Sequence, residues 1–459
     1  MKTKHYLYLV YLLLALSACE KADYLDDKQN TEILTPTTLP DFQQILDNTG
    51  TMATSGGLAQ ISSDDNDISY ANYLTATATE RNAYVWARNI YDGDVKIQDW
   101  DALYKQVFYS NIVLEGLAKS DSLNSTKGQY LRGWALFCRA FAFYDLTQNF
   151  CNVYDGSTAS LDLGIPLRLS SAIDYTLQRS TLHQAYDRIL SDLNESLPLL
   201  PFDRAAANLN RPSKNSAYAL LSRIYLNMRD YSQAEKYADA SLAIYSALID
   251  YNTISKTSET PFSRTNLELI NYRQQVAAYS RLTDTYVDSY VKVNKDLLAL
   301  YAPNDLRKQV YFDTLGDGTY TKKKGYHGYG GYPFTGLATD ELYLIKAECL
   351  ARRSEVNSAM DKLNELLKMR FLNTTPYIPL VAISATDALE KVLLERRKEL
   401  VWRGIRWHDI KRLNKEGANI TLTRTLNNVT YTLPPNDIRY IFPIPDDEIS
   451  FTDLKQNPR

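Results

Sequence analysis

Apolar side chains recur every three or four positions over most of the chain, which is the spacing of helices that bury one face. The clearest case runs from residue 213 to residue 244. Tyr218 and Tyr225 lie on one face of its first predicted helix, and Ala234 and Ala238 lie on one face of its second. Small side chains at such positions let two helices cross closely, so the segment predicts a helical hairpin.

This spacing resembles a tetratricopeptide (TPR) hairpin, a repeat unit that buries a core only by stacking on its neighbours. A second copy spans residues 340–370. A third lies within residues 100–200 and is split, because its helix 133–146 is followed by its partner 181–197 only after an insertion of about thirty residues. The chain is therefore predicted to be mostly α, with TPR-type hairpins as its scaffold.

Long irregular stretches separate the predicted helices. They are residues 49–99, 149–180, 245–338 and 416–459. Loops of this length are usually functional or contain small elements of their own. Residues 420–433 alternate as a β-hairpin around Asn427 and Asn428. The scaffold is thus expected to carry long irregular loops and small β-hairpins on one face.

A dense run of charged and aromatic residues, ERRKELVWRGIRWHDIKR, spans residues 395–412. A catalytic cluster, a nucleic-acid-binding helix and a piece of scaffold are the three interpretations. Drawn as one helix, the run puts Glu395 about 20 Å from His408, too far apart to act on one substrate atom. The following side chains share one helical stripe and can pack and pair: Glu395, Glu399, Trp402, Arg406 and Asp409. The scaffold interpretation fits best.

Composition narrows the function classes. The formal net charge is -3, which argues against a protein that mainly binds nucleic acid. Tyrosine is the outlier, with 35 Tyr against 13 Phe and 5 Trp, and tyrosine suits both half-buried helix seams and sugar-binding surfaces. Cys138 stands among predicted core aromatics and is expected to be a buried thiol, although a bridge to Cys151 is an alternative.

The N-terminus has the features of an export signal. Lys2 and Lys4 precede an apolar run of about ten residues, which ends in Leu-Ser-Ala before Cys19. This resembles a bacterial lipobox, so we expect a lipoprotein signal peptide at 1–18, cleavage before Cys19 and attachment of lipid to its thiol. An ordinary signal peptide is the alternative. Residues 19–40 are predicted to be an acidic tether, and no other segment has the apolar run needed to cross a bilayer.

The C-terminal run LLERRKELVWRGIRWHDIKR resembles the closing helix of the SusD/RagB family of outer-membrane nutrient-binding lipoproteins. Other segments match that family in order: ADYLDD behind Cys19, WDALYKQVFYSN, GWALFCRAFAFYDL with GIPL after it, the hairpin at 213–244, DELYLIKAECLARRSEVNSAMDKLN, and IFPIPDDEISFTDLKQNPR. The likeness covers nearly all of the chain after Cys19. It implies a single SusD-like domain at 41–459, with the family's C-terminal segment at 385–459.

The resemblance implies a non-catalytic protein. Such proteins sit over a SusC-like TonB-dependent transporter, anchored by lipid to the outer membrane of a Gram-negative cell and facing its exterior. They bind a glycan, or less often a peptide, on the irregular face. A protein-only TPR adaptor and a surface glycoside hydrolase remain as alternatives, because two carboxylates at the right distance are enough for glycoside hydrolysis.

Two loops combine aromatic rings with hydrogen-bonding side chains, as a sugar-binding surface requires. Candidate contacts in the loop 63–94 are Tyr84, Trp86, Tyr91, Asp65 and Asp67, with Tyr70 and Tyr73 between them. Candidates in the loop 320–336 are Tyr326, Tyr329 and Tyr332. Packing beneath its loop is the alternative for Trp86.

Cofactor motifs are weak in this chain. No cofactor is expected, although Asp64, Asp65 and Asp67 leave open a structural calcium ion. The glycines at 325–331 are not followed by the Gly-Lys-Ser/Thr of a phosphate-binding loop. Lys322–Lys324 is expected to be a solvated charge run, with attraction of an anionic saccharide as the alternative.

Overall fold

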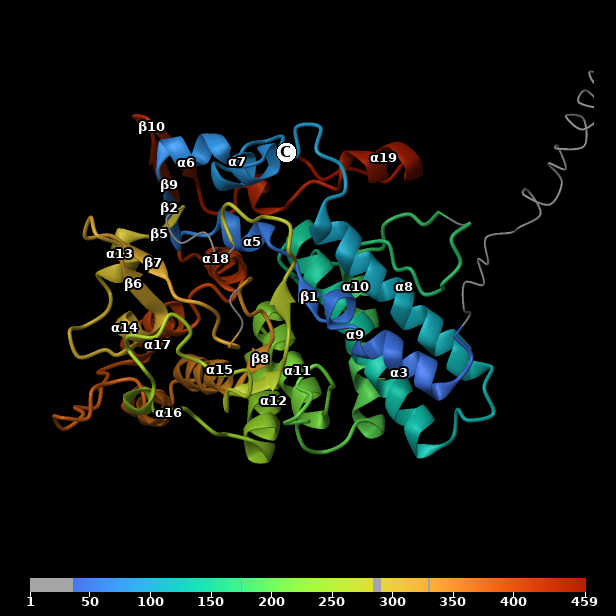
Figure 1. The fold of residues 1–459 in the computed structure, drawn as a ribbon, viewed down its shortest axis with the longest axis horizontal. Coiled ribbons are helices and arrows are strands. Elements are labelled where there is room, and N and C mark those ends of the chain that lie inside the picture. The colour runs from blue at the N-terminus through green and yellow to red at the C-terminus, as the bar shows by residue number, and fades with distance from the viewer. Residues whose placement is uncertain (1–35, 175, 284–289, 329–330) are drawn as a thin grey trace, which may run out of the picture. The chain divides into compact units, whose positions relative to one another are not determined.

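A row of packed helical hairpins forms the scaffold of residues 38–459 (Figure 1). Its helices are α8 (Gln98–Ala118), α9 (Thr126–Phe150), α10 (Leu182–Ser196), α11 (Lys214–Met228), α12 (Tyr231–Ile244), α15 (Thr339–Arg352), α16 (Val356–Lys368) and α17 (Ala385–Glu399). Along the row, α9 contacts α8 and α10, α11 contacts α10 and α12, and α15 contacts α12, α16 and α17. The predicted mostly α fold with helical hairpins is confirmed.

The structure is a computed structural model that describes residues 36–174, 176–283, 290–328 and 331–459. The predicted signal peptide 1–18, Cys19 and most of the predicted tether lie outside the described residues. The folded unit starts slightly earlier than expected, since α3 (Leu39–Asp47) begins within the predicted tether. Thr38 and Asp41 form a reciprocal capping box there, with the Thr38 amide donating to the Asp41 carboxylate at 2.9 Å.

The hairpin at residues 213–244 is confirmed as α11 and α12. Ser213 caps the start of α11, and Arg229 ends it in the left-handed conformation at φ 63°. Asp230 then caps α12 by accepting from the Gln233 amide at 3.1 Å. Ser222 Oγ donates to the Ala234 carbonyl at 3.0 Å, so the two helices touch where small residues were predicted. Whether the pair belongs to the TPR class stays a prediction.

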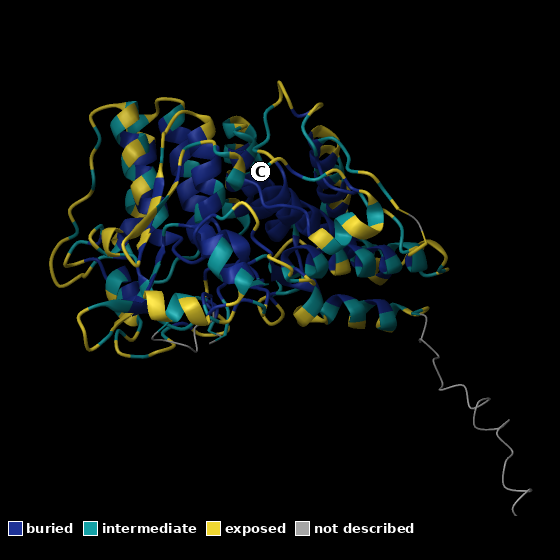
Figure 2. Ribbon diagram, turned by 90° about the horizontal axis from the view of Figure 1, so that it is seen from above, coloured by how far each residue is buried: buried dark blue, intermediate teal, exposed yellow. Residues whose placement is uncertain are grey.

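Helix α9 runs through the core, and nearly all of its side chains from residue 133 onward are buried. A helix that is apolar all round needs neighbours on every side, and Figure 2 shows buried helices at the centre with exposed loops around them. Cys138, Cys151 and Cys349 are buried free thiols. The thiol prediction for Cys138 is confirmed, and the alternative bridge to Cys151 is absent.

Short elements cover the scaffold. The helical ones are α4 (Thr49–Met52), α5 (Leu58–Ser62), α6 (Tyr70–Thr75), α7 (Ala78–Tyr84), η1 (Leu197–Leu199), η2 (Tyr251–Thr253), α13 (Lys295–Leu298), α14 (Arg307–Tyr311), α18 (Arg406–Lys415), η3 (Ile438–Tyr440) and α19 (Asp446–Thr452). The strands are β1 (Thr54–Ser55), β2 (Asn66–Ile68), β3 (Leu269–Asn271), β4 (Gln274–Gln275), β5 (Val291–Val293), β6 (Phe312–Thr314), β7 (Tyr320–Lys322), β8 (Leu337–Ala338), β9 (Leu422–Leu426) and β10 (Val429–Leu433). They pair in twos: β1–β4, β2–β5, β3–β8, β6–β7 and β9–β10.

The predicted β-hairpin is confirmed as β9 and β10. Leu426 pairs with Val429 across the turn. Asn427 and Asn428 both have positive φ, at 47° and 63°, the conformation in which asparagine is favoured and which suits the twist of the two strands.

The run 395–412 is not one helix, so that prediction is wrong. Helix α17 ends at Glu399 and α18 begins at Arg406. Between them Trp402 and Gly404 take positive φ, at 54° and 69°, which reverses the chain. The 20 Å separation of Glu395 and His408 therefore no longer applies, and the single stripe of side chains is divided between two helices.

Candidate functional site

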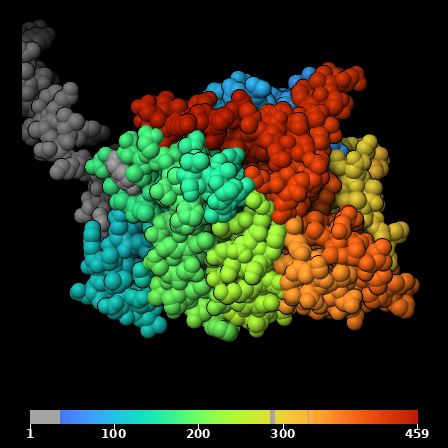
Figure 3. Space-filling view, turned by 180° about the vertical axis from the view of Figure 1, so that it is seen from behind, coloured from blue at the N-terminus to red at the C-terminus, as the bar shows by residue number. Residues whose placement is uncertain are grey.

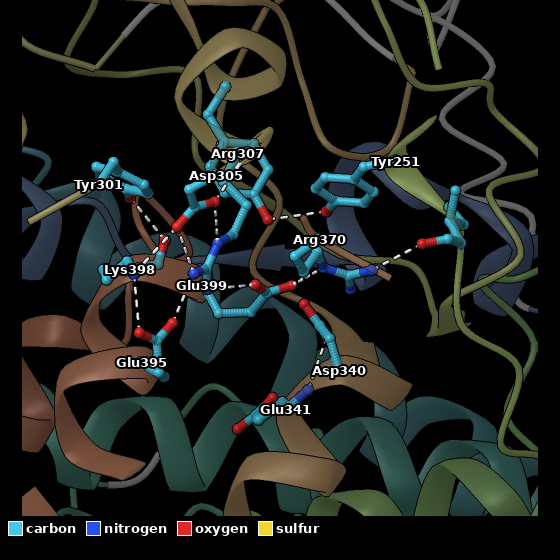
Figure 4. A network of polar contacts seen from close by, with 12 residues as sticks. Tyr251, Tyr301, Asp305, Arg307, Asp340, Glu341, Arg370, Glu395, Lys398 and Glu399 are labelled. Atoms are coloured by element: carbon cyan, nitrogen blue, oxygen red, sulfur yellow. Dashed lines mark hydrogen bonds and ion pairs between the residues drawn. The ribbon is translucent and has the colours of Figure 1, made fainter. Parts of the chain in front are cut away.

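The charged run is built into a buried ion-pair network (Figure 4). Arg307 on α14 is fully buried and contacts three carboxylates, with its Nε 2.9 Å from Asp305, its Nη2 2.5 Å from Glu395 and its Nη1 3.0 Å from Glu399. Lys398 Nζ adds contacts to Asp305 at 3.0 Å and to Glu395 at 2.8 Å. Two segments 88 residues apart in the sequence meet here, which ties α17 to the irregular part of the chain.

The network continues through Glu399 to Arg370, whose Nε lies 2.7 Å from the Glu399 carboxylate. Arg370 Nη2 reaches Glu268 at 2.6 Å. Burial works against ionisation of Glu399, yet Arg370 and Arg307 hold its pKa below the usual value. Burial outweighs Arg370 at Glu268 and raises the pKa of that carboxyl to about 7.

A second branch joins α18 to the hairpin scaffold. Arg412 forks onto Glu348 at 2.6 and 2.8 Å, and Arg396 reaches Asp409 at 2.8 Å. Although burial opposes it, Arg396 and Arg412 lower the pKa of Asp409 to about 2. His408 is desolvated, which lowers its pKa to about 3 and leaves it neutral. Most charged groups of this run thus make ion pairs inside the protein, in support of the scaffold interpretation.

The loop 320–336 turns most of its aromatic rings inward. Tyr326 is half-buried, and its ring centre lies 4.9 Å from that of Phe262 and 5.6 Å from that of Phe334, in tilted contacts. Its hydroxyl donates to Glu268. Together with Arg403 these rings line a small cavity of about 50 Å³ that Glu399 of the network also lines. Tyr332 is half-buried, and Tyr329 lies outside the described residues.

The lysine run of this loop is held by protein groups. Lys322 donates to the Thr283 carbonyl at 2.5 Å, Lys323 donates to the Lys256 carbonyl, and Lys324 pairs with Glu259 at 2.9 Å. The expected solvated run is in fact partly buried. These contacts weaken the alternative that it attracts an anionic saccharide.

The main candidates of the loop 63–94 are in the core, which corrects the prediction. Tyr84, Trp86 and Tyr91 are all nearly inaccessible. The Arg424 guanidinium lies 3.7 Å from the centre of the Tyr84 ring and 4.7 Å from that of Trp86. Trp86 Nε1 donates to the Ser62 carbonyl at 2.9 Å, and the Tyr91 hydroxyl donates to the Pro443 carbonyl at 2.6 Å. Each polar tip is satisfied inside the protein, so no ring face is left for a ligand.

The acidic candidates of this loop are engaged in different ways. Asp64 is bound by Arg406 at 2.7 Å and Arg397 at 2.9 Å. Asp65 is buried, and burial together with the charge of Asp64 raises its pKa to about 6. Asp67 is half-buried and accepts from Asn294 at 3.3 Å. The described residues contain no group of three or more His, Cys, Asp or Glu side chains that could hold a metal ion.

A different set of rings from the same sector reaches the surface. Helix α6 has no buried residue, and its Tyr70 and Tyr73 stack at 6.1 Å with an interplanar angle of 17°. Tyr70 is 42% exposed. Tyr431 of β10 lies beside Tyr73, in keeping with the position of α6 next to β9 and β10 in Figure 1. We call Tyr70, Tyr73, Tyr431 and Tyr290 the tyrosine ledge.

Tyr290 joins the tyrosine ledge through its backbone. Its carbonyl accepts from the Asn72 amide at 3.4 Å, and the Arg281 guanidinium lies 4.6 Å from its ring centre. The ledge thus offers half-exposed rings with an amide and a guanidinium beside them. Tyr70 and Tyr73 stand three residues apart just after the capping residue Ser69, so they lie on one face of a short helix. This spacing is the sequence signal that distinguishes them from Tyr84 and Trp86.

Comparisons with known proteins agree over both halves of the chain. Residues 23–226 match a family model described as starch-binding and associating with the outer membrane, and residues 306–459 match the SusD family model. A relative, SusD-like protein P2 of Formosa agariphila, is 26% identical over 68% of this chain and 71% of its own length.

Solved structures share the fold. A SusD superfamily protein of Bacteroides thetaiotaomicron is 20% identical, with a TM-score of 0.74 over 92% of this chain and 100% of that one. A SusD-like carbohydrate binding protein of Bacteroides vulgatus is 20% identical, with a TM-score of 0.68 over 91% and 97% of the two chains. Among the described residues no helix is both long and apolar enough to cross a membrane. With both halves matched and the fold shared along the chain, this protein belongs to the SusD/RagB family.

Proposed function

We propose that this chain is a lipid-anchored outer-membrane protein that binds a glycan on the tyrosine ledge. It then passes the glycan to a SusC-like TonB-dependent transporter and breaks no bond itself. The family description as starch-binding and the name of the carbohydrate-binding structural relative support the ligand class.

The stacked pair of exposed Tyr70 and half-buried Tyr73 is the observation that carries the ligand part of the proposal. Sugar rings have an apolar face that packs on aromatic rings, and their hydroxyls bond to amides and charged groups. A ring must be accessible to serve in this way, and Tyr70 is. Asn72 and Arg281 stand close enough to supply the polar contacts.

Membrane attachment rests on the N-terminal sequence. The lipobox-like segment before Cys19 and the acidic stretch behind it suit an anchored, surface-facing protein. The family description places relatives at the outer membrane. The transporter partner is inferred from the family resemblance alone, and capture of a SusC-like protein by the anchored chain is its test.

Replacing Tyr70 with Ala is expected to weaken glycan binding by about tenfold, the loss that removal of one stacking ring causes. The measurement is the retardation of the chain lacking residues 1–19 in native gels cast with different polysaccharides. Phe451→Ala on α19 is the matched control, because Phe451 is a highly exposed ring far from α6 in the sequence. The control should migrate like the parent protein.

Three other results would contradict the proposal. Released sugar in the same mixtures would identify a hydrolase. Retardation that Tyr70→Ala leaves unchanged would move the ligand away from the tyrosine ledge. Capture of a partner protein without retardation by any polysaccharide would favour the adaptor alternative.

A further inference from the structure

A large polar groove lies away from the tyrosine ledge. It runs between the segment that follows α9, residues 152–162, the end of α18, and the turn at residues 436–441. Its volume is about 560 Å³, within the range of ligand sites, which typically measure about 300–1,000 Å³. On the face drawn in Figure 3, the teal-green surface of the segment after α9 adjoins the red surface of the C-terminal part. No residue of the tyrosine ledge lines this groove.

Hydrogen bonds hold the rim of the groove in place. Asp162 accepts from Asn152 Nδ2 at 3.1 Å and from Thr158 Oγ1 at 2.6 Å. Across the groove, Asn436 donates its amide to the Asn414 carbonyl at 3.1 Å. The rim thus presents carboxylate, amide and hydroxyl groups in fixed positions, and a ligand need not order them on binding.

The floor holds two buried polar groups with unused bonding capacity. Lys411 is 6% exposed, and its Nζ donates to the Gln148 carbonyl at 2.6 Å and the Cys151 carbonyl at 3.1 Å. An ammonium group has three N–H bonds, so one N–H of Lys411 remains to donate to a ligand. Tyr440 is 4% exposed, and its buried hydroxyl makes no hydrogen bond of good geometry, although the Asn414 side chain lies beside it. Such a group costs stability unless something in the groove pairs with it.

The charges of the groove nearly cancel. Lys415 pairs with Asp155 at 3.0 Å, and Asp437 pairs with Arg439 at 2.8 Å. Lys411 and Asp162 are left, one of each sign. A groove without net charge favours neither cations nor anions, while its many donors and acceptors favour a neutral ligand rich in hydroxyls.

An apolar wall completes the groove. Val153, Ile438 and Ile441 line it beside the Tyr440 ring. A sugar ring has C–H bonds on its faces and hydroxyls at its edge, so it can use a wall and a polar rim together. We infer that the polar groove is a second saccharide site, which binds a neutral mono- or disaccharide separately from the tyrosine ledge.

Tyr440→Phe gives the sharpest test, since it deletes the buried hydroxyl and nothing else. Binding of maltose, cellobiose, lactose and xylobiose to the full chain in detergent is measured by titration calorimetry. At least one disaccharide should bind the parent protein, and Tyr440→Phe should lower the affinity for that disaccharide by about tenfold. Thermal unfolding of Tyr440→Phe should match that of the parent or rise, because removing a buried hydroxyl without a hydrogen bond of good geometry costs little.

Matched substitutions on the rim complete the experiment. Thr158→Val should lower the affinity for the same disaccharide. Thr432→Val, at an exposed position of β10, should leave that affinity unchanged. Tyr70→Ala should also leave the affinity for the disaccharide unchanged, although this substitution reduces the retardation by polysaccharide gels. The two proposed sites are therefore tested independently. Absence of heat with all four disaccharides would overturn the inference, as would a binding signal that Tyr70→Ala removes and Tyr440→Phe does not.

Discussion

Arg307→Met is expected to lower the free energy of unfolding by about 3–5 kcal/mol, the usual loss when one partner of a buried ion pair is removed. The Arg307 guanidinium contacts Asp305, Glu395 and Glu399, and all four side chains are buried. Without it, the three carboxylates keep Lys398 and Arg370 as their cationic partners among the described residues. Urea unfolding followed by tryptophan fluorescence gives the difference directly.

The surface pair of Arg132 and Glu195 provides the control, since its side chains are 3.2 Å apart and both are exposed. Arg132→Met should change the unfolding free energy by less than about 1 kcal/mol. The loss of unfolding free energy for Arg307→Lys should lie between those for Arg307→Met and Arg132→Met. Lysine keeps the positive charge but lacks the planar guanidinium that contacts three carboxylates. Equal, small effects of all three substitutions would mean that the network does not hold the fold together.

Binding measurements separate a structural network from a catalytic one. If the network is scaffold, Arg307→Met should retain polysaccharide binding at any temperature at which it is still folded. Loss of binding in a folded Arg307→Met protein would place the charged cluster at the ligand instead.

Local spacing predicted the hairpins well because the contacts that make them are local. The hairpin at 213–244 needs only apolar and small residues at helical intervals and a cap at its turn. The break within 395–412 depends on distant partners. Trp402 Nε1 bonds the Asn66 side chain, and Arg406 bonds Asp64, each across more than 330 residues. The spacing of residues within the run does not reveal these distant contacts, so it could not predict the break.

The exposed aromatic surface was harder to predict for the same reason. Tyr84 and Trp86 have the composition of a sugar platform, and their burial is decided by Arg424, which lies 340 residues beyond Tyr84 and inserts against both rings. Tyr70 and Tyr73 stay outside because every residue of α6 remains at least partly accessible. The sequence pointed to this sector, but it did not show which of its rings face the solvent.

Asp99→Asn is expected to stabilise the protein at neutral pH by up to about 3 kcal/mol, from the ~1.4 kcal/mol carried by each pKa unit. Asp99 is fully buried in the first turn of α8, where its Oδ1 accepts from the Gly57 and Leu58 amides at 2.8 and 3.0 Å. Its Oδ2 makes no hydrogen bond of good geometry, although the Tyr279 hydroxyl lies beside the carboxylate. Burial, set against the two amide bonds and the Tyr279 hydroxyl, raises the pKa of Asp99 to about 6 from an ordinary value of 3.8. Asparagine keeps an acceptor at Oδ1 and carries no charge to desolvate.

The sign of the effect follows from proton binding. Between about pH 4 and pH 6 the folded protein holds the Asp99 proton more tightly than the unfolded chain does, so this group's contribution to stability falls as pH rises through that window. The advantage of Asp99→Asn should therefore be largest near pH 7.5 and should vanish near pH 4, when urea midpoints of variant and parent are compared at each pH. Asp121→Asn, at an exposed position, should follow the parent throughout. A difference between Asp99→Asn and parent that stays constant with pH would mean that Asp99 ionises as freely in the folded protein as in the unfolded chain, and that its buried position costs nothing at neutral pH.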